Sequence, residues 1–222
     1  VDTDQSPYDS GSYASSTTYV TGMAVVKACE SMRKRICEEA AAIMGLKANE
    51  VDFDGETISE NDNPEHSMTL SDLITSLEAG NGRIIEVTES HTSPVSPPPF
   101  MAGAAEIEVD LQTGKITPIN YVAAVDCGTV INTNLARIQT EGGIVQGMGM
   151  TLYEDVQYTD AGKMKNRNFM SYKIPTRLDM GNIKVEFESS YEETGPFGAK
   201  SIGEIVINTP APAIADAVYN AT

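Results

Sequence analysis

One carboxylate near the end of the chain stands in surroundings that could make it a base. Glu204 follows the segment Gly195-Pro-Phe-Gly-Ala-Lys-Ser-Ile-Gly203, and three glycines in nine positions favour close backbone approach or positive φ. If this loop is covered, a carboxyl group among glycine and aliphatic residues is poorly solvated. Desolvation would raise its pKa toward the range of a general base. The alternative, from composition alone, is an ordinary acid of a surface loop.

The segments "GPFGAKSIGE" and "PAPAIADAVYNA" resemble the C-terminal signature of the molybdenum hydroxylases, the xanthine dehydrogenase and aldehyde oxidoreductase family, in the form found in bacterial xanthine dehydrogenase large subunits. The resemblance implies that Glu204 lies beside the molybdenum and acts as the base. It also covers "PYDSGSYASSTTY", where it implies that the pterin is held by Ala14, Ser15, Ser16 and Thr17. From the residues alone, the same hydroxyl cluster fits an N-cap for the following helix.

A glycine-laden helix is expected at 134–152. It contains Gly142, Gly143, Gly147 and Gly149, and each costs a helix roughly 1 kcal/mol relative to alanine. Tight packing or close approach to a ligand must offset that cost. The resemblance implies that Gln146 contacts the cofactor, whereas the residues alone favour a buried glutamine satisfied by the backbone.

The resemblance adds two cofactor-binding candidates beside the base, Lys200 and Gly203. A lysine four residues before Glu204 could anchor an anion, and a surface lysine is the alternative. The resemblance implies no direct protein ligand to the metal, because the pterin dithiolene holds the molybdenum.

The implied reaction is hydroxylation of an electron-poor carbon with oxygen from water. Glu204 takes a proton from molybdenum-bound water, a hydride passes to a sulfido ligand, and electrons leave through [2Fe-2S] clusters to FAD and NAD. The small-molecule substrate is a purine such as xanthine, or alternatively an aldehyde, nicotinate or carbon monoxide. A non-catalytic structural or interaction domain is the alternative from a different class.

The matches run along the whole chain, which implies a fragment: the second half of the molybdopterin-binding region. The missing first half and the iron–sulfur and FAD subunits or domains are then its partners. The fragment alone is expected to be inactive and without bound cofactor. We expect residues 1–222 to form one C-terminal molybdopterin-binding domain. The open alternative is a division into two subdomains, at about 18–100 and 101–222, with residues 1–17 as a cofactor loop.

Composition narrows the possible partners. A net charge of −17 argues against nucleic acid and anionic membranes. No apolar run approaches the ~18 residues of a membrane span. Three cysteines without paired spacing suit a reducing, cytoplasmic compartment and offer no iron–sulfur motif. Cys29 and Cys37 lie in a helical pattern, where small buried hydrophobes are expected.

The fold expected is α+β, with mixed sheets flanked by helices. Val25, Cys29, Met32, Ile36 and Ile43 form one stripe of a helix over 18–44 that stops at Gly45. Other helices are expected at 69–78, at 134–152 and after Thr209-Pro210, with Thr209 as a hydroxyl cap. The remaining pattern predicts a hairpin at 105–110 and 115–124, a turn at 62–64, and strands at 51–58, 83–88, 152–158, 164–173 and 183–190.

Overall fold

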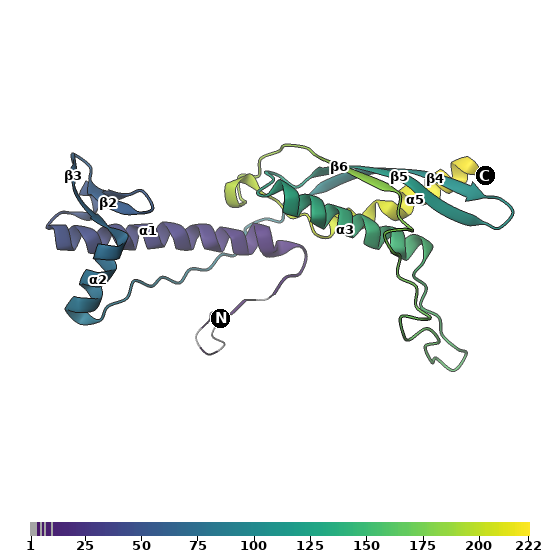
Figure 1. Ribbon diagram of the computed structural model, residues 1–222, viewed down its shortest axis with the longest axis horizontal. Coiled ribbons are helices and arrows are strands. Elements are labelled where there is room, and N and C mark those ends of the chain that lie inside the picture. Colours follow the sequence, from purple (N-terminus) through teal and green to yellow (C-terminus); the bar gives the residue numbers. More distant parts are fainter. Residues whose placement is uncertain (1–3, 5, 7, 10) are drawn as a thin grey trace. The chain divides into compact units, whose positions relative to one another are not determined.

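The computed structural model describes residues 4, 6, 8, 9 and 11–222, and the chain divides into two compact units. Unit 1 comprises Val1–Asp9 and Val20–Thr92, and unit 2 comprises Ser10–Tyr19 and Ser93–Thr222. Each unit has its own three-stranded sheet and its own helices (Figure 1). The predicted α+β class is therefore confirmed. Among the described helices, none combines the length and apolar character that a membrane crossing requires.

Unit 1 is built on one long helix. A π-helical turn, η1 (Thr17–Thr21), leads into α1 (Gly22–Met44), which ends at Gly45 with φ of 72° as predicted. Positive φ favours glycine at this position because a side chain would clash with the backbone. After the short helix η2, the antiparallel sheet β1–β2–β3 and the helix α2 complete the unit: η2 Ala48–Glu50, β1 Val51–Phe53, β2 Thr57–Glu60, β3 Asn63–Thr69 and α2 Leu70–Asn81.

The core of unit 1 gathers around the C-terminal half of α1. Ile36, Cys37, Ala40 and Ala41 are buried there against residues of β1, β2 and α2. The predicted helix at 69–78 is confirmed, and Thr69 caps it by accepting a hydrogen bond from the Asp72 backbone N–H at 3.1 Å.

Four expectations for unit 1 were wrong in whole or in part. The strand expected at 51–58 is two strands, β1 and β2, separated by residues 54–56. The turn expected at 62–64 lies at 61–62, because β3 already begins at Asn63. Residues 83–88 are not a strand: no described strand lies beside them, and their backbone has no regular partner. Cys29, expected to be buried, is exposed.

Unit 2 contains a mixed sheet in the order β4–β5–β6. The hairpin strands β4 (Phe100–Asp110) and β5 (Lys115–Asp126) are antiparallel, and β6 (Asn182–Phe187) runs parallel to β5. The hairpin expectation is confirmed, with strands longer than predicted. The crossover from β5 to β6 passes through α3 (Thr133–Leu152), which Asn132 caps by accepting a hydrogen bond from the Leu135 N–H at 3.0 Å.

The chain of unit 2 ends with three short elements. These are η3 (Pro196–Gly198), α4 (Ile205–Asn208) and α5 (Pro210–Ala221). The helices α3 and α5 lie along the same face of the sheet (Figure 1). Tyr121, Ala123 and Val125 of β5 point into the core beneath these helices, while Val122 between them is 46% exposed. This period of two follows from the pleat of the strand.

The glycines of α3 allow close packing rather than forming a flexible stretch. A Cβ at Gly143 would lie 2.2 Å from Cγ2 of Val206, and one at Gly147 would lie 2.8 Å from the Ile207 carbonyl oxygen. At Gly149 the obstacle would be Oε1 of Glu154, at 2.4 Å, whereas Gly142 faces open space. Three of the four helix glycines thus have a packing reason.

Other expectations for unit 2 were wrong. Strands were expected at 152–158 and 164–173, but Leu152 ends α3 and the other residues belong to a long loop with one isolated bridge, Tyr158 to Met164, because no neighbouring strand is available. The strand expected at 183–190 ends at Phe187. Thr209 does precede α5, yet its side chain makes no cap: it accepts a hydrogen bond from the Tyr121 hydroxyl at 2.8 Å, which fixes the helix to the sheet.

Neighbouring glycines of α3 give a matched stability test. Gly143→Ala should lower the free energy of unfolding by about 1–3 kcal/mol, because the new methyl group overpacks against Val206. Gly142→Ala should raise it by about 0.5–1 kcal/mol, because alanine is the better helix former and nothing obstructs it. Urea denaturation measures both. Equal effects of the two substitutions would contradict the packing role of Gly143.

Candidate functional site

Two loops that the sequence analysis marked as candidate cofactor segments, residues 14–17 and residues 195–204, meet in unit 2. The backbone N–H of Glu204 donates a hydrogen bond to Oγ of Ser15 at 2.7 Å, across 189 positions of sequence. Between them lies Gly203, where a Cβ would stand 3.1 Å from the same Oγ atom. A side chain at 203 would therefore fill the space that these two loops share.

Both loops have strained backbone. Ala14, Ser15 and Phe197 have φ values of 48°, 55° and 52°, and no other non-glycine residue has positive φ in the part of the chain that the structure describes. Such conformations cost of order 1–3 kcal/mol each and concentrate where function fixes the backbone. All three residues lie in the two loops, 14–17 and 195–204, in which the sequence analysis expected a ligand site.

Two backbone hydrogen bonds, together called the clasp below, hold the Gly195–Glu204 loop to the residues at the end of β5. The Thr129 N–H donates to the Gly198 carbonyl at 2.8 Å, and the Lys200 N–H donates to the Cys127 carbonyl, also at 2.8 Å. Gly128 makes this approach possible, since a Cβ there would lie 2.3 Å from the Gly198 oxygen.

A buried ion pair reinforces the clasp. The Lys200 ammonium lies 2.6 Å from Oδ2 of Asp126, and the lysine is 8% exposed. Asp126 also accepts hydrogen bonds from the Ser190 hydroxyl at 2.5 Å and the Gly128 N–H at 3.0 Å. Burial pushes the pKa of Asp126 upward, but these donors and the lysine outweigh it and hold the pKa below its usual value. The alternative of a surface lysine is wrong.

A cavity of 290 Å³ opens beside these hydrogen bonds, and residues of η1, of the start of α3 and of the loop before Glu204 line it. Thr18 comes from η1, Asn132 and Gln139 come from the start of α3, and Lys200 and Ile202 come from the loop before Glu204. The buried thiol of Cys127 also lines the cavity, and desolvation raises its pKa, which keeps it protonated and poorly nucleophilic.

The glutamine that reaches these loops is one that the sequence reading missed. Nε2 of Gln139 would lie 3.8 Å from a Cβ at Gly203, whereas Gln146 lies two turns further along α3 and is exposed rather than buried. Gln139 lies four residues before the tightly packed Gly143, on the same side of the helix. Gln146, three residues after Gly143, shares that side, so the spacing alone does not select between the two glutamines.

Glu204 itself has an exposed side chain, and so has Thr17, while Ser15 and Ser16 are partly buried. Among the described residues, no three His, Cys, Asp or Glu side chains cluster as a metal site would require. The arrangement can therefore present hydroxyl and amide groups to a polar ligand, with one free carboxylate at its edge.

A protein-family model described as "Molybdopterin cofactor-binding domain" matches residues 1–181. The chain is 33% identical to "Probable hypoxanthine oxidase XdhD" of Escherichia coli (strain K12), over 99% of this chain and 23% of that protein. It is 30% identical to "Xanthine dehydrogenase molybdenum-binding subunit" of Escherichia coli O157:H7, over 100% of this chain and 30% of that protein. The chain thus spans less than a third of the length of these relatives.

Solved structures share the fold. The Cu,Mo-CO dehydrogenase in its carbon monoxide reduced state superposes with a TM-score of 0.83 at 23% identity, over 99% of this chain and 28% of that chain. The aldehyde oxidoreductase from Desulfovibrio desulfuricans superposes with a TM-score of 0.73 at 23% identity, over 98% of this chain and 22% of that chain.

The Asp126–Lys200 pair gives a pH-dependent stability test. Because the pKa of Asp126 is lower in the folded chain, its contribution is fully present above the unfolded value near 3.9 and is lost as the pH falls through the folded value. Asp126→Asn should cost roughly 1–3 kcal/mol at pH 7. Urea denaturation of both proteins should show this difference shrinking in acid, while the exposed control Asp160→Asn changes little. A difference independent of pH would contradict the pairing.

Proposed function

Because the chain belongs to the molybdopterin cofactor-binding domain family of the molybdenum hydroxylases, we propose that it is part of a xanthine dehydrogenase-like hydroxylase with Glu204 as its catalytic base. One observation supports this assignment above the others. The Glu204 backbone is tied to Ser15 at 2.7 Å, so the expected base lies beside the loop expected to hold the pterin.

The residues at this junction fit a pterin cofactor. A Cβ at Gly203 would stand 3.1 Å from the Ser15 hydroxyl oxygen and 3.8 Å from Nε2 of Gln139, so glycine keeps the space between these two groups open. Consecutive positive φ values at Ala14 and Ser15 shape the loop in which backbone N–H groups can face an anionic or hydrogen-bonding ligand. We assign Ala14–Thr17 and Gly203 to cofactor binding.

The two glutamines and Lys200 are assigned according to their positions. We assign Gln139, near Gly203, as the amide that contacts the cofactor, and Gln146, seven residues further along the same side of the helix and likewise exposed, remains a candidate. Lys200 is already paired with Asp126, which favours a positioning role over direct contact with phosphate. Its ion pair holds the loop that carries Glu204.

When bound, the cofactor supplies a Lewis-acidic, redox-active molybdenum that can accept two electrons. Glu204 accepts a proton from the attacking water, which makes that oxygen nucleophilic toward an electron-poor carbon. Ser15 keeps the Glu204 backbone in place during this transfer, and the clasp around Gly128 keeps the rest of the loop fixed. The chain's own contribution is thus one proton acceptor on an oriented backbone.

The remaining parts of such an enzyme would lie outside these 222 residues. The lengths of the relatives support further molybdenum-binding regions on the same subunit, and we propose iron–sulfur and FAD subunits or domains as electron acceptors. Residues 1–222 alone are proposed to be inactive, because the exposed Glu204 side chain lacks the cover that would desolvate it.

A purine is the proposed substrate class, since the relatives at 33% and 30% identity are named for hypoxanthine and xanthine. The alternative substrates are aldehydes, nicotinate and carbon monoxide, and the carbon monoxide dehydrogenase large chain of Afipia carboxidovorans is 24% identical over 99% of this chain and 28% of that protein. Assay of the assembled enzyme on this panel separates them.

A non-catalytic structural domain is the second candidate, favoured by the exposed side chains of Glu204 and Gln146. It predicts no dependence of turnover on Glu204, so one substitution discriminates the two functions.

Glu204→Gln in the assembled enzyme should lower kcat by at least about 100-fold, because glutamine cannot accept the proton. Molybdenum and pterin content should stay unchanged, since the backbone hydrogen bond to Ser15 does not involve the altered group. Steady-state kinetics with metal analysis measures both quantities. The control is Glu108→Gln, an exposed acid of β4. Full activity of Glu204→Gln would remove the proposed role.

A further inference from the structure

The apolar stripe of α1 is only half covered within unit 1. The C-terminal half of the helix packs into the core through Ile36, Cys37, Ala40 and Ala41, and only Ile43 of the stripe is exposed there, at 47%. Toward the N-terminus the stripe continues with Val25, Cys29 and Met32, but Val25 is 56% exposed and Cys29 is exposed. An amphipathic helix normally buries its whole apolar face, so this half lacks its packing partner.

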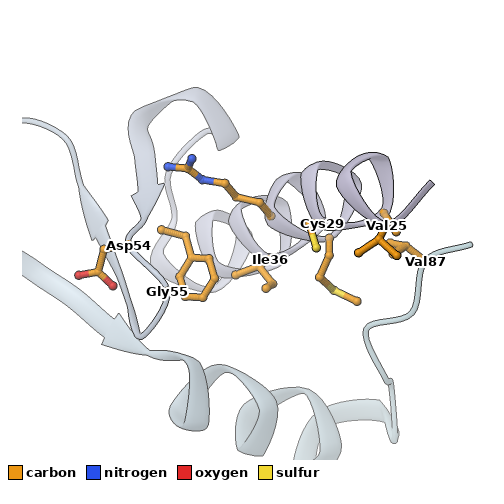
Figure 2. Close-up of a pocket in the computed structure, with 10 residues that line it drawn as sticks. Val25, Cys29, Ile36, Asp54, Gly55 and Val87 are labelled. Atoms are coloured by element: carbon orange, nitrogen blue, oxygen red, sulfur yellow. The ribbon is translucent and has the colours of Figure 1, made fainter. Parts of the chain in front are cut away.

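The uncovered half of the stripe forms the floor of an open groove of 550 Å³. Val25, Cys29, Met32 and Ile36 line it from α1, while Phe53 and Val87 line it from β1 and from the extended segment after α2. Figure 2 shows Val25, Cys29 and Ile36 along α1, with Val87 beside Val25 and with Asp54 and Gly55 at the other end. The groove is continuous with the core, because Ile36 belongs to both and Phe53 packs against that core.

The charged residues at the rim are satisfied within unit 1. Arg33 pairs with Asp52 at 2.5 Å, and Asp54 accepts hydrogen bonds from the backbone N–H groups of Glu56 and Thr57. These bonds lower the pKa of Asp54 and keep it ionised in its own turn. The groove is therefore suited to binding aliphatic or aromatic side chains rather than a charged partner.

The geometry points to a docking groove for an apolar segment of the same molybdenum-binding polypeptide, from the part outside residues 1–222. This inference rests on the proposed function only in placing the chain within a longer molybdenum-binding subunit.

Two observations favour the same polypeptide over a separate partner. The relatives and the solved structures extend this fold with more than twice its own length of further chain, which is available at high effective concentration. A groove that continues a domain core also resembles a permanent interface, in which apolar side chains meet as in a core cut in half. Transient partners bind more polar surfaces.

Cys29 provides the probe, since it is the exposed thiol of the groove while Cys37 and Cys127 are buried. In the complete subunit, maleimide labelling of each cysteine is followed by peptide mass spectrometry. The matched reference is Lys34→Cys, on the opposite side of α1, where the lysine side chain is 79% exposed. If the groove is filled, Cys29 should react at least about 100-fold more slowly than this reference cysteine.

A labelling rate of Cys29 within about threefold of the reference would overturn the proposal, because thiol reactivity follows exposure. Protection that appears only at high subunit concentration would assign the groove to a second copy. Protection that appears only after the iron–sulfur or FAD subunits are added would assign it to another chain. Either of these results also overturns it. Labelling requires no turnover, so its outcome is separate from that of Glu204→Gln.

A substitution pair gives an independent measurement in the complete subunit. Val25→Gln should shorten the half-life of thermal inactivation by about threefold or more if apolar side chains cover Val25, while Lys34→Gln on the opposite side changes it by less than about 1.5-fold. Were the groove open to water, Val25→Gln would be as neutral as its control, because the valine is already more than half exposed. That result would contradict the proposal.

Discussion

The pairing of Lys200 with Asp126 is the constraint on which the candidate site depends. A lysine that is 8% exposed must keep its counter-charge, because an uncompensated buried cation is costly. Asp126 stands at the end of β5, so the sheet holds the loop through this pair and through the backbone clasp at Gly128. The strained residue Phe197 and the base candidate Glu204 both belong to this loop, and each is carried by the same anchor.

The glycine-rich helix α3 serves the same arrangement from the other side. Gly143 and Gly147 allow Val206, Ile207 and Pro210 to approach its backbone, which sets the position of the turn just after Glu204. The Tyr121–Thr209 hydrogen bond then connects that turn to the sheet. The site is thus defined by contacts among neutral residues and one ion pair, while its single free carboxylate remains at the surface.

Two exposed features of this chain would be covered by the further polypeptide that we propose. Glu204 is exposed at the site, and the apolar side chains of Val25 and Cys29 in the N-terminal half of α1 are exposed in unit 1. A base needs a low-dielectric environment, and an apolar helix face needs a partner, for the same reason: both are stabilised by removal of water. Membership of a family whose matched relatives are far longer gives both features one explanation.

The sequence by itself determined the α+β class and the helices that begin at Thr69 and end at Gly45, because caps, glycines and periodicity act locally. The candidate loops around Ser15 and Glu204 came from the resemblance of their motifs to the family, since the residues alone fitted an N-cap and a surface acid equally well. Only the tertiary structure decided that 83–88 and 164–173 form no strands, since a strand requires a neighbour with which to pair. It also decided that Lys200 is buried on Asp126 and that Gln139 is the amide near Gly203, because contacts between distant residues are not encoded in any local pattern.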